Sequence, residues 1–278
     1  SPHTLMDDFG DIFDWNNSGY NNKVKPEHIL WIDFTGLPAA GLGTNNEHDF
    51  QGGHDFVPRL RDEPKDKKGR QGELKAALAA NGHEFGGYGG ASPLPLLADR
   101  SSWDDGDLRY DKTFTQEYEG IPLKFVYCKK LWNLSSEFSP RGNKNENVVM
   151  IRLADIYLMA GEAENELNGP DNAYQYVNKV RERAFEPDQP WSGMTQSEFR
   201  VEMQEERMHE LCMENHRKPD LVRWGIYVER IRNTQFQKHN AQAATNVQEK
   251  HRYAPIPLSE IQLNPNLLNT DPTNNGYR

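Results

Sequence analysis

The spacing of hydrophobic positions divides the chain near residue 147, because regular helical periods occur only after that point. The clearest period starts at Val149, and its apolar positions recur at steps of four, three, four, three and four. Such steps place the side chains on one face of a helix of about five turns. The sequence Asn168-Gly169-Pro170 then supplies residues that typically end a helix. The predicted apolar face consists of Val149, Leu153, Ile156, Ala160, Ala163 and Leu167.

Three more helices are predicted after the first. Asp171 is a suitable N-cap for the second helix, which a proline pair at positions 187 and 190 closes. The residues Thr195-Gln196-Ser197-Glu198 form a capping-box pattern and predict a third helix that extends to about His216. Pro219 stands at the first turn of a fourth helix, and the apolar positions after it are spaced by three, four and three residues. These positions are Leu221, Trp224, Val228 and Ile231.

The four helices form two pairs of about 35 to 45 residues each, which is typical of an α-solenoid of the tetratricopeptide class. Two pairs are fewer than the ~3 repeats that such an array needs for stability, so we expect the array to continue elsewhere. The expected fold class is therefore mainly α, with tetratricopeptide-like helix pairs and long irregular loops.

The first half of the chain has a different character. Residues 73–80 predict a short helix, and residues 29–34 and 123–127 predict short strands, whereas glycine and proline interrupt much of the rest. Residues 59–70 are mostly polar, and we expect a mobile surface stretch there. We expect a loop-rich region over residues 1–147 and a helix-pair region over residues 148–278, which together form one structural unit.

Charge and composition limit the classes of partner. The 32 Lys and Arg residues stand against 42 Asp and Glu residues, and the net charge of −10 would repel a nucleic-acid backbone. The only two cysteines, Cys128 and Cys212, exclude a disulfide scaffold. No hydrophobic run approaches the ~20 residues of a membrane span. The first residues lack the features of a signal peptide, so we expect any targeting segment to lie outside this sequence or to have been removed.

The sequence contains only incomplete versions of known catalytic and metal-binding motifs. His209 and Glu210 resemble the start of a zinc-protease motif, but Met213 stands where the second histidine is required. His209, Cys212 and His216 share one helical face and could chelate zinc, although packing is the more frequent role of such a set. The acidic run 104–107 lacks the spacing of a calcium loop, and the glycine-rich stretch 86–90 lacks the ending of a phosphate loop. We therefore expect no catalytic residue, no metal and no cofactor.

Aromatic residues in loop-like contexts are the best candidates for ligand binding. Rings beside Asn, Asp and Gly suit sugars, because the C–H faces of a sugar stack on a ring while its hydroxyls bond to polar neighbours. The more common role of such aromatics is to anchor a loop to the core. Tyr88 and Trp103 are the first candidates for ligand binding, followed by Trp15 and Asn45.

Several segments of the chain resemble the SusD/RagB-like outer-membrane lipoproteins. Residues 151–167, IRLADIYLMAGEAENEL, resemble the family's Arg-Leu-Ala-Asp helix. Residues 206–225, ERMHELCMENHRKPDLVRWG, look like its second hallmark, and residues 255–277 resemble its closing segment. The stretch 87–114 is similar to the loop that precedes those helices. Asn215 and Lys218-Pro219 depart from the family's usual residues, and we expect this to alter helix packing more than function.

The resemblance implies a cell-surface protein that binds oligosaccharide or another nutrient and delivers it to a TonB-dependent outer-membrane transporter of the SusC type. It also implies that no bond is made or broken and that the glycan contacts lie in the loops, which differ between members. Family members are longer than this chain and carry a lipid-bearing cysteine and earlier helix repeats. We therefore expect this chain to be the C-terminal portion of a protein that is lipid-anchored at the outer membrane.

The acidic residues of the second hallmark are expected to have a structural role. Glu206, Glu210 and Glu214 lie four residues apart, with Arg207 and Arg217 interleaved. Arginine forks can bridge carboxylates between packed helices, so we expect ion pairs rather than acid–base catalysis.

Two other classes of function remain open from the sequence. A glycoside hydrolase would need two facing carboxylates about 5 to 10 Å apart in a cleft. The 42 acidic residues include no obvious pair. A peptide-binding helical-repeat adaptor would instead bind along a concave groove of the helix pairs.

Overall fold

The computed structural model describes residues 2–13, 25–32, 57–60, 70–80, 89, 93–132, 148–235, 241–269 and 271–277. Contacts between residues divide the chain into two compact units. The larger unit comprises Ser1–Pro93 and Leu97–Glu214, and the smaller one comprises Leu94–Leu96 and Asn215–Arg278. The main division therefore lies near Glu214, and the regions 1–147 and 148–278 expected from hydrophobic spacing do not correspond to these units.

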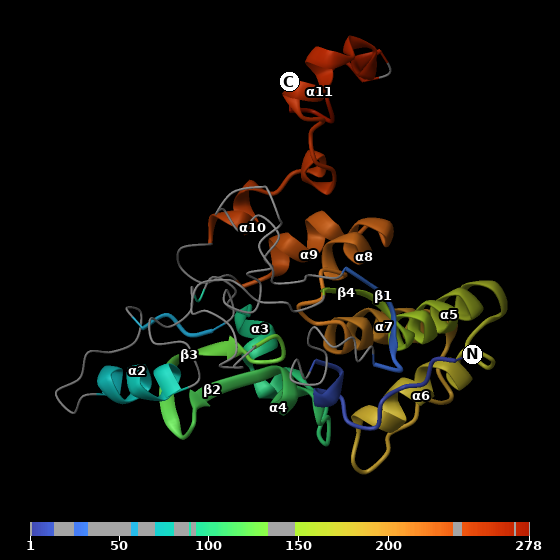
Figure 1. Ribbon diagram of the computed structural model, residues 1–278. Helices are drawn as coiled ribbons and strands as arrows, with labels where there is room; N and C mark the ends of the chain where they lie inside the picture. Colours follow the sequence, from blue (N-terminus) through green and yellow to red (C-terminus); the bar gives the residue numbers. More distant parts are fainter. Residues whose placement is uncertain are drawn as a thin grey trace. The chain divides into compact units, whose positions relative to one another are not determined.

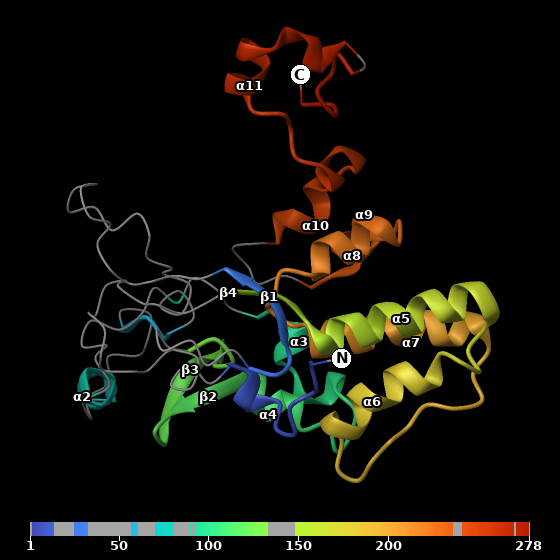
Figure 2. The same cartoon turned by 45° about the vertical axis from the view of Figure 1, so that its right-hand side comes forward.

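Three helices form the centre of the larger unit. They are α5 (Leu153–Asn168), α6 (Tyr174–Ala184) and α7 (Gln196–Glu210), and α5 packs against both of the others (Figures 1 and 2). Their shared core consists of Ala154, Leu158, Ala173, Val177, Val180, Trp191, Phe199, Met203 and Leu211. These helices correspond to the first three helices predicted from the sequence.

The ends of these helices follow local sequence signals. Gly169 has a φ of 89° and ends α5, a conformation that glycine adopts without the strain of a side chain. The Thr195 hydroxyl accepts a hydrogen bond from the backbone N–H of Glu198, and the Glu198 carboxylate accepts one from the backbone N–H of Thr195. The predicted capping box is thus confirmed. The N-cap of α6 is Ala173 rather than the predicted Asp171, and α7 ends at Glu210 rather than near His216.

The predicted start of α5 and its predicted buried face are both wrong. Residues 148–152 form strand β4 (Val148–Arg152), which pairs antiparallel with β1 (His28–Ile32), so α5 begins only at Leu153. Pairing with a distant strand thus overrides the helical spacing of Val149. The face of α5 that packs on the neighbouring helices contains Ala154, Leu158, Gly161 and Asn165. Much of the predicted face, including Ile156 and Leu167, is exposed instead.

A hairpin and a short helix build a second part of the larger unit. Strands β2 (Phe114–Tyr118) and β3 (Ile121–Cys128) are joined at Glu119 and Gly120, whose φ values of 48° and 77° are those of a tight two-residue turn. Helix α2 (Arg70–Ala80) packs Leu74 and Leu78 against this hairpin. The helix expected over residues 73–80 and the strand expected over 123–127 are confirmed, as is the strand from residue 29 to 32. Residues 33–34 and most of the stretch 59–70 lie outside the described residues.

The remaining elements before Glu214 are short. They are η1 (Gly10–Phe13), α3 (Pro95–Ala98), η3 (Arg100–Ser102) and α4 (Arg109–Thr113). Phe9, Ile12 and Phe13 form a small buried cluster around η1. Among these elements, α4 contacts β2, η1 and α7.

The elements described in the smaller unit, over residues 215–235, 241–269 and 271–277, are short helices. They are α8 (Arg217–Arg223), α9 (Tyr227–Asn233), α10 (Gln242–Asn246), η5 (Glu249–Arg252), α11 (Leu258–Leu263) and η6 (Pro265–Leu268). The single helix predicted after Pro219 is divided into α8 and α9, because Gly225 takes a φ of 75° between them. Helices predominate over strands in the described residues of both units, as expected. Over the same residues, no helix has both the length and the apolar character that crossing a membrane requires.

Candidate functional site

Trp103, one of the predicted ligand-binding aromatics, is a core residue. It follows η3, and only 4% of it is exposed. Its indole N–H donates to the Leu97 carbonyl oxygen at 3.0 Å, and its ring stacks on the His209 imidazole with centroids 4.1 Å apart. Tyr110 and Phe114 meet the indole edge to face. A ring enclosed on these sides offers no face to a sugar, so the structure does not support Trp103 as a stacking residue.

The other predicted binding residues, Tyr88, Trp15 and Asn45, lie outside the described residues. Their roles therefore stay predictions. Trp191, another loop aromatic, is buried edge-on against Phe199 in the core of α5–α7. It anchors its loop, which is the common role of such residues.

A cluster of buried charges lies between α7 and the segments around it. Arg109, the first residue of α4, binds Asp107 at 2.7 Å, Glu206 at 2.6 Å and Glu210 at 3.0 Å. Both glutamates belong to α7 and lie about 100 residues later in the chain. Arg109 therefore fixes the short helix α4 against α7.

Arg152 occupies the centre of the same cluster. It is the last residue of β4, and it binds Glu27 at 2.8 Å, Glu210 at 2.5 Å and Glu214 at 2.7 Å. It also donates to the Glu210 carbonyl oxygen at 2.7 Å. One guanidinium thus joins the segment before β1, the end of β4 and the end of α7.

Three further cations complete the cluster. Arg181 and Arg183 of α6 bind Glu206 and Glu210 respectively, and Arg183 also binds Glu27. Lys130, which follows β3, binds Glu214 at 2.5 Å. All these side chains are buried or nearly so. The arrangement supports the structural role predicted for the three glutamates.

The cations of the cluster come from segments that the sequence did not single out. Arg207 bridges packed helices as expected, since it pairs with Asp155 of α5 at 2.9 Å, but it does not supply the cation of this cluster. The cations around the glutamates come from α4, α6, β4 and the end of β3 instead. The sequence gives little signal for this partnership, since Arg152 and Glu210 lie 58 residues apart.

The electrostatic environment keeps the buried carboxylates ionised. Burial alone would raise the pKa of Glu210, but Arg183, Arg152 and Arg109 together lower that pKa well below its ordinary value. Burial is likewise outweighed by neighbouring cations at Glu206 and Glu214, whose pKa values are also lowered. A general acid needs a raised pKa, so these three residues are poorly suited to protonating a leaving group.

The two metal-binding patterns considered from the sequence gain no support. Within the described residues, no group of three or more His, Cys, Asp or Glu side chains is arranged to hold a metal ion. Asp107, from the acidic run, is engaged by Arg109. Burial is the largest cause of a lowered pKa at His209, with Arg109 the next, which keeps its imidazole neutral. The thiols of Cys128 and Cys212 are both buried.

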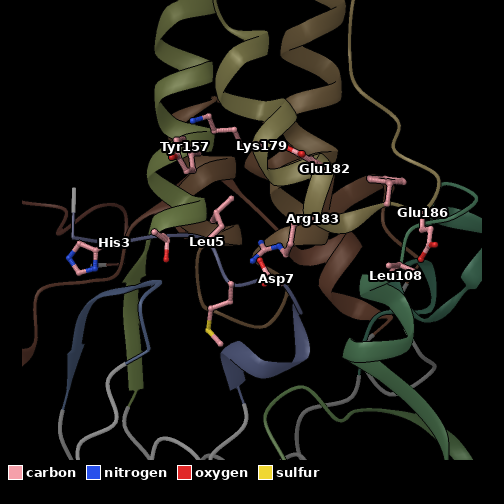
Figure 3. Close-up of a pocket in the computed structure, with 12 residues that line it drawn as sticks. His3, Leu5, Asp7, Leu108, Tyr157, Lys179, Glu182, Arg183 and Glu186 are labelled. Carbon is pink, nitrogen blue, oxygen red and sulfur yellow. The ribbon is translucent and has the colours of Figure 1, made fainter.

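A cavity of about 650 Å³ lies in the larger unit beside α5 and α6. Figure 3 shows Tyr157 of α5 and Lys179 and Glu182 of α6 around it, with Leu5 and Asp7 from the N-terminal segment. The Lys179 ammonium lies 5.3 Å from the centre of the Tyr157 ring. The volume is in the range of small-molecule sites, and carboxylates, a cation and an aromatic ring can together bind a hydroxyl-rich ligand.

No pattern in the sequence indicates this cavity, because its lining comes from several separate segments. Glu186 and Leu108 complete its far side. None of these residues forms a motif with its sequence neighbours. Tyr157 lies in the helix that resembles a family motif, and that resemblance does not indicate a cavity.

Comparisons with known proteins identify the relatives of this chain. The model of the SusD family matches residues 100–277. The chain is 42% identical over 287 residues to the SusD-like protein P25 of Formosa agariphila, covering 100% of this chain and 53% of that protein. It thus spans about half the length of the curated relative it matches.

Solved structures show the same fold. Surface glycan-binding protein A from Bacteroides thetaiotaomicron in complex with laminarihexaose has a TM-score of 0.65 and 18% identity, covering 94% of this chain and 54% of that one. A laminarin-binding SusD-like protein has a TM-score of 0.60 and 22% identity, covering 94% and 52%. Since the family model alone spans well over half of the sequence, the chain belongs to the SusD family.

Proposed function

We propose that this protein binds a glycan at the cell surface and delivers it to a TonB-dependent outer-membrane transporter of the SusC type. The single observation that carries the proposal is membership of the SusD family. It is supported by the fold shared with proteins that are named for binding surface glycan or laminarin. No bond is made or broken in this role. The protein would be held at the outer membrane by a lipid anchor outside this sequence.

The helices of the larger unit would act as a scaffold in this function. Between these helices, the carboxylates of the cluster around Arg109 and Arg152 are already engaged by cations. Groups engaged in this way have little capacity left for a ligand. The helix pairs would be part of a tetratricopeptide-like array, in line with the prediction from the sequence.

The sugar would be held by irregular segments and by the cavity. Tyr88 and Trp15 are proposed as stacking residues and Asn45 as a hydrogen-bonding residue. The cavity beside α5 offers a second location, with Tyr157 as its aromatic ring.

Isothermal titration calorimetry against a glycan panel that includes laminarin tests the proposal. We expect Tyr88→Ala, Trp15→Ala and Asn45→Ala to weaken binding of the same glycan severalfold or more. Tyr157→Ala tests the cavity separately. Tyr253→Ala, at an exposed tyrosine of the smaller unit, is the matched control and should leave affinity unchanged.

Three results would count against the proposal or against a part of it. Absence of binding to every glycan in the panel would remove its basis, whereas unchanged affinity in all four variants would reject the assigned residues alone. Release of new reducing ends from a bound glycan would establish a glycoside hydrolase instead. The lowered pKa values of Glu206, Glu210 and Glu214 argue against these residues as its acid.

A further inference from the structure

The cavity beside α5 and α6 has an acidic lining. Asp7, Glu182 and Glu186 bring three carboxylates to it, and Lys179 and Arg183 bring two cations (Figure 3). The three acidic residues are exposed, and within the described residues none of their carboxylates forms an ion pair or accepts a hydrogen bond. Their capacity to accept hydrogen bonds is therefore open to a ligand.

Arg183 does not neutralise these carboxylates, because it is engaged inside the protein. Its Nη1 atom donates to Glu27 at 2.8 Å, and its Nη2 atom donates to Glu210. The ring of His3 bonds to a backbone carbonyl oxygen at 3.1 Å. Three carboxylates of the lining thus face one lysine, Lys179, and one histidine. The cavity therefore has an excess of negative charge, and the net charge of −10 of the whole chain adds to it.

The Nε–H group of Arg183 indicates that the cavity lacks an acceptor. This atom is buried and has no hydrogen-bond partner among the residues that the structure describes. The Arg183 side chain is only 4% exposed, yet the residue lines the cavity. Because a buried donor without an acceptor is unfavourable, native proteins almost always supply one. An oxygen atom of a ligand, in direct contact or through a bound water, would supply it here.

Apolar groups complete the lining. Leu5, Leu108 and Phe185 contribute aliphatic and aromatic surface, and Tyr157 contributes a ring from α5. Sugars combine apolar C–H faces with several hydroxyls, so a pyranose ring suits this mixture of apolar groups, acceptors and a donor.

The charge of the lining narrows the class of sugar. A neutral hydroxyl can donate to a carboxylate but leaves its charge uncompensated, and covering an uncompensated charge is unfavourable. An ammonium group donates and also neutralises, and such charge-assisted hydrogen bonds are the stronger ones. A sugar that carries a carboxylate or a sulfate would bring a like charge to the three carboxylates. The lining therefore favours a sugar that carries a protonated amine.

We propose that the cavity binds a cationic amino sugar, a hexose unit whose protonated amine is bound by the carboxylates of Asp7, Glu182 and Glu186. An oxygen atom of the same unit accepts from the Nε–H of Arg183. The inference rests on the proposed function, and it assigns a ligand class to one of the two binding locations. The other location, in the irregular segments, does not enter it.

Calorimetry with matched oligosaccharides tests the ligand class. The probes are a β-1,4-linked glucosamine tetramer, its fully N-acetylated counterpart and a neutral glucose tetramer, each titrated into this chain at pH 6, where free sugar amines are largely protonated. We expect the amine form to bind at least about tenfold more tightly than the other two. Spermine, which carries as many amines but no sugar ring, should bind at least about tenfold more weakly than the glucosamine tetramer. Equal affinity of the amine and N-acetylated forms, or tighter binding of spermine, would overturn the proposal.

Substitutions at exposed positions of the lining test the site itself. Glu182→Gln and Asp7→Asn should each weaken binding of the glucosamine tetramer by about tenfold, because each removes one carboxylate. Glu202→Gln removes an exposed carboxylate of α7 outside the lining, and this matched control should leave the affinity unchanged. Lys179→Gln should strengthen binding severalfold, because it removes a cation that repels the amine. Unchanged affinity in Glu182→Gln and Asp7→Asn, or weaker binding in Lys179→Gln, would overturn the proposal.

Failure of this inference differs from failure of the proposed function. If neutral glycans bind and the glucosamine tetramer does not, the ligand class assigned to the cavity is wrong, whereas the glycan-binding role stands. If no glycan binds, whether neutral or amine-bearing, both are wrong.

Discussion

The Nη1 atom of Arg152 lies 2.5 Å from Oε1 of Glu210, and both side chains are almost completely buried. The two residues stand at the end of β4 and the end of α7, 58 residues apart in the chain. Because Arg152 also binds Glu27 and Glu214, the stability of this junction depends on one guanidinium. Buried ion pairs of this kind contribute little when intact, but breaking one leaves an uncompensated buried charge.

Arg152→Gln is therefore expected to lower the free energy of unfolding by about 3–5 kcal/mol. The loss is expected because the buried carboxylates of Glu27, Glu210 and Glu214 lose the cation that they share. Denaturant unfolding followed by circular dichroism measures the change. Arg200→Gln is the control, because Arg200 and Glu166 form an exposed pair worth about 1 kcal/mol or less. If both variants lost the same free energy of unfolding, the buried cluster would contribute no more to stability than the exposed pair.

Substitution of Trp103 tests whether this residue stabilises the fold or binds the glycan. Trp103→Ala removes a buried ring that stacks on His209, and we expect it to lower the free energy of unfolding by about 3–5 kcal/mol. Glycan affinity, measured by calorimetry on the folded fraction, should not change. Trp103→Phe keeps an aromatic ring and should lower the free energy of unfolding by less than Trp103→Ala. If Trp103→Ala weakened glycan binding but left the free energy of unfolding unchanged, Trp103 would be a ligand-binding residue.

The sequence predicted what depends on near neighbours in the chain. Gly169 ends α5, and Thr195 with Glu198 caps α7, because backbone conformation and capping bonds act over a few residues. Val149 was misassigned, since its strand forms only when β1 supplies the partner. Contacts between distant segments produce no periodic pattern in the local sequence, so the sequence alone does not predict them.

The same reason limits the prediction of the candidate site. The spacing of Glu206, Glu210 and Glu214 indicated ion pairs, but not that Arg109 and Arg152 would supply the cations. No sequence motif predicts the cavity, because its lining residues come from separate segments. The apolar period of α5 was recognised, but it described the outer face, while the small residues Ala154 and Gly161 face the core.

Cys128 is expected to be unreactive in the folded protein. Burial is the main cause that raises the pKa of its thiol to about 11, so very little thiolate is present at pH 8. Iodoacetamide at pH 8 should therefore modify Cys128 only after denaturant is added. Mass spectrometry of the peptide that contains the residue measures the rate, with a Cys212→Ser background removing the other thiol. Rapid modification without denaturant would show that this part of the hairpin opens readily.

Stability should fall in two stages as the solution is acidified. Burial is the main cause that lowers the pKa values of His28 and His209 below 6.5 in the folded chain, so between those lowered values and pH 6.5 the unfolded chain binds more protons. The free energy of unfolding should therefore decrease as the pH falls through 6.5. A second decrease should begin near pH 4.5, because the folded-state pKa values of Glu206, Glu210 and Glu214 are lowered and their stabilising charge is lost on protonation.

Denaturant unfolding at intervals from pH 8 to pH 3 measures both stages. His209→Gln should reduce the stage near pH 6.5, because it removes one of the two buried histidines whose pKa is lowered. Glu210→Gln should remove part of the lower stage at the cost of stability at neutral pH, because the cations around it lose a charged partner. A free energy of unfolding that stays constant from pH 8 to pH 5 would contradict the burial of neutral histidines, and constancy below pH 4.5 would contradict the ionised cluster.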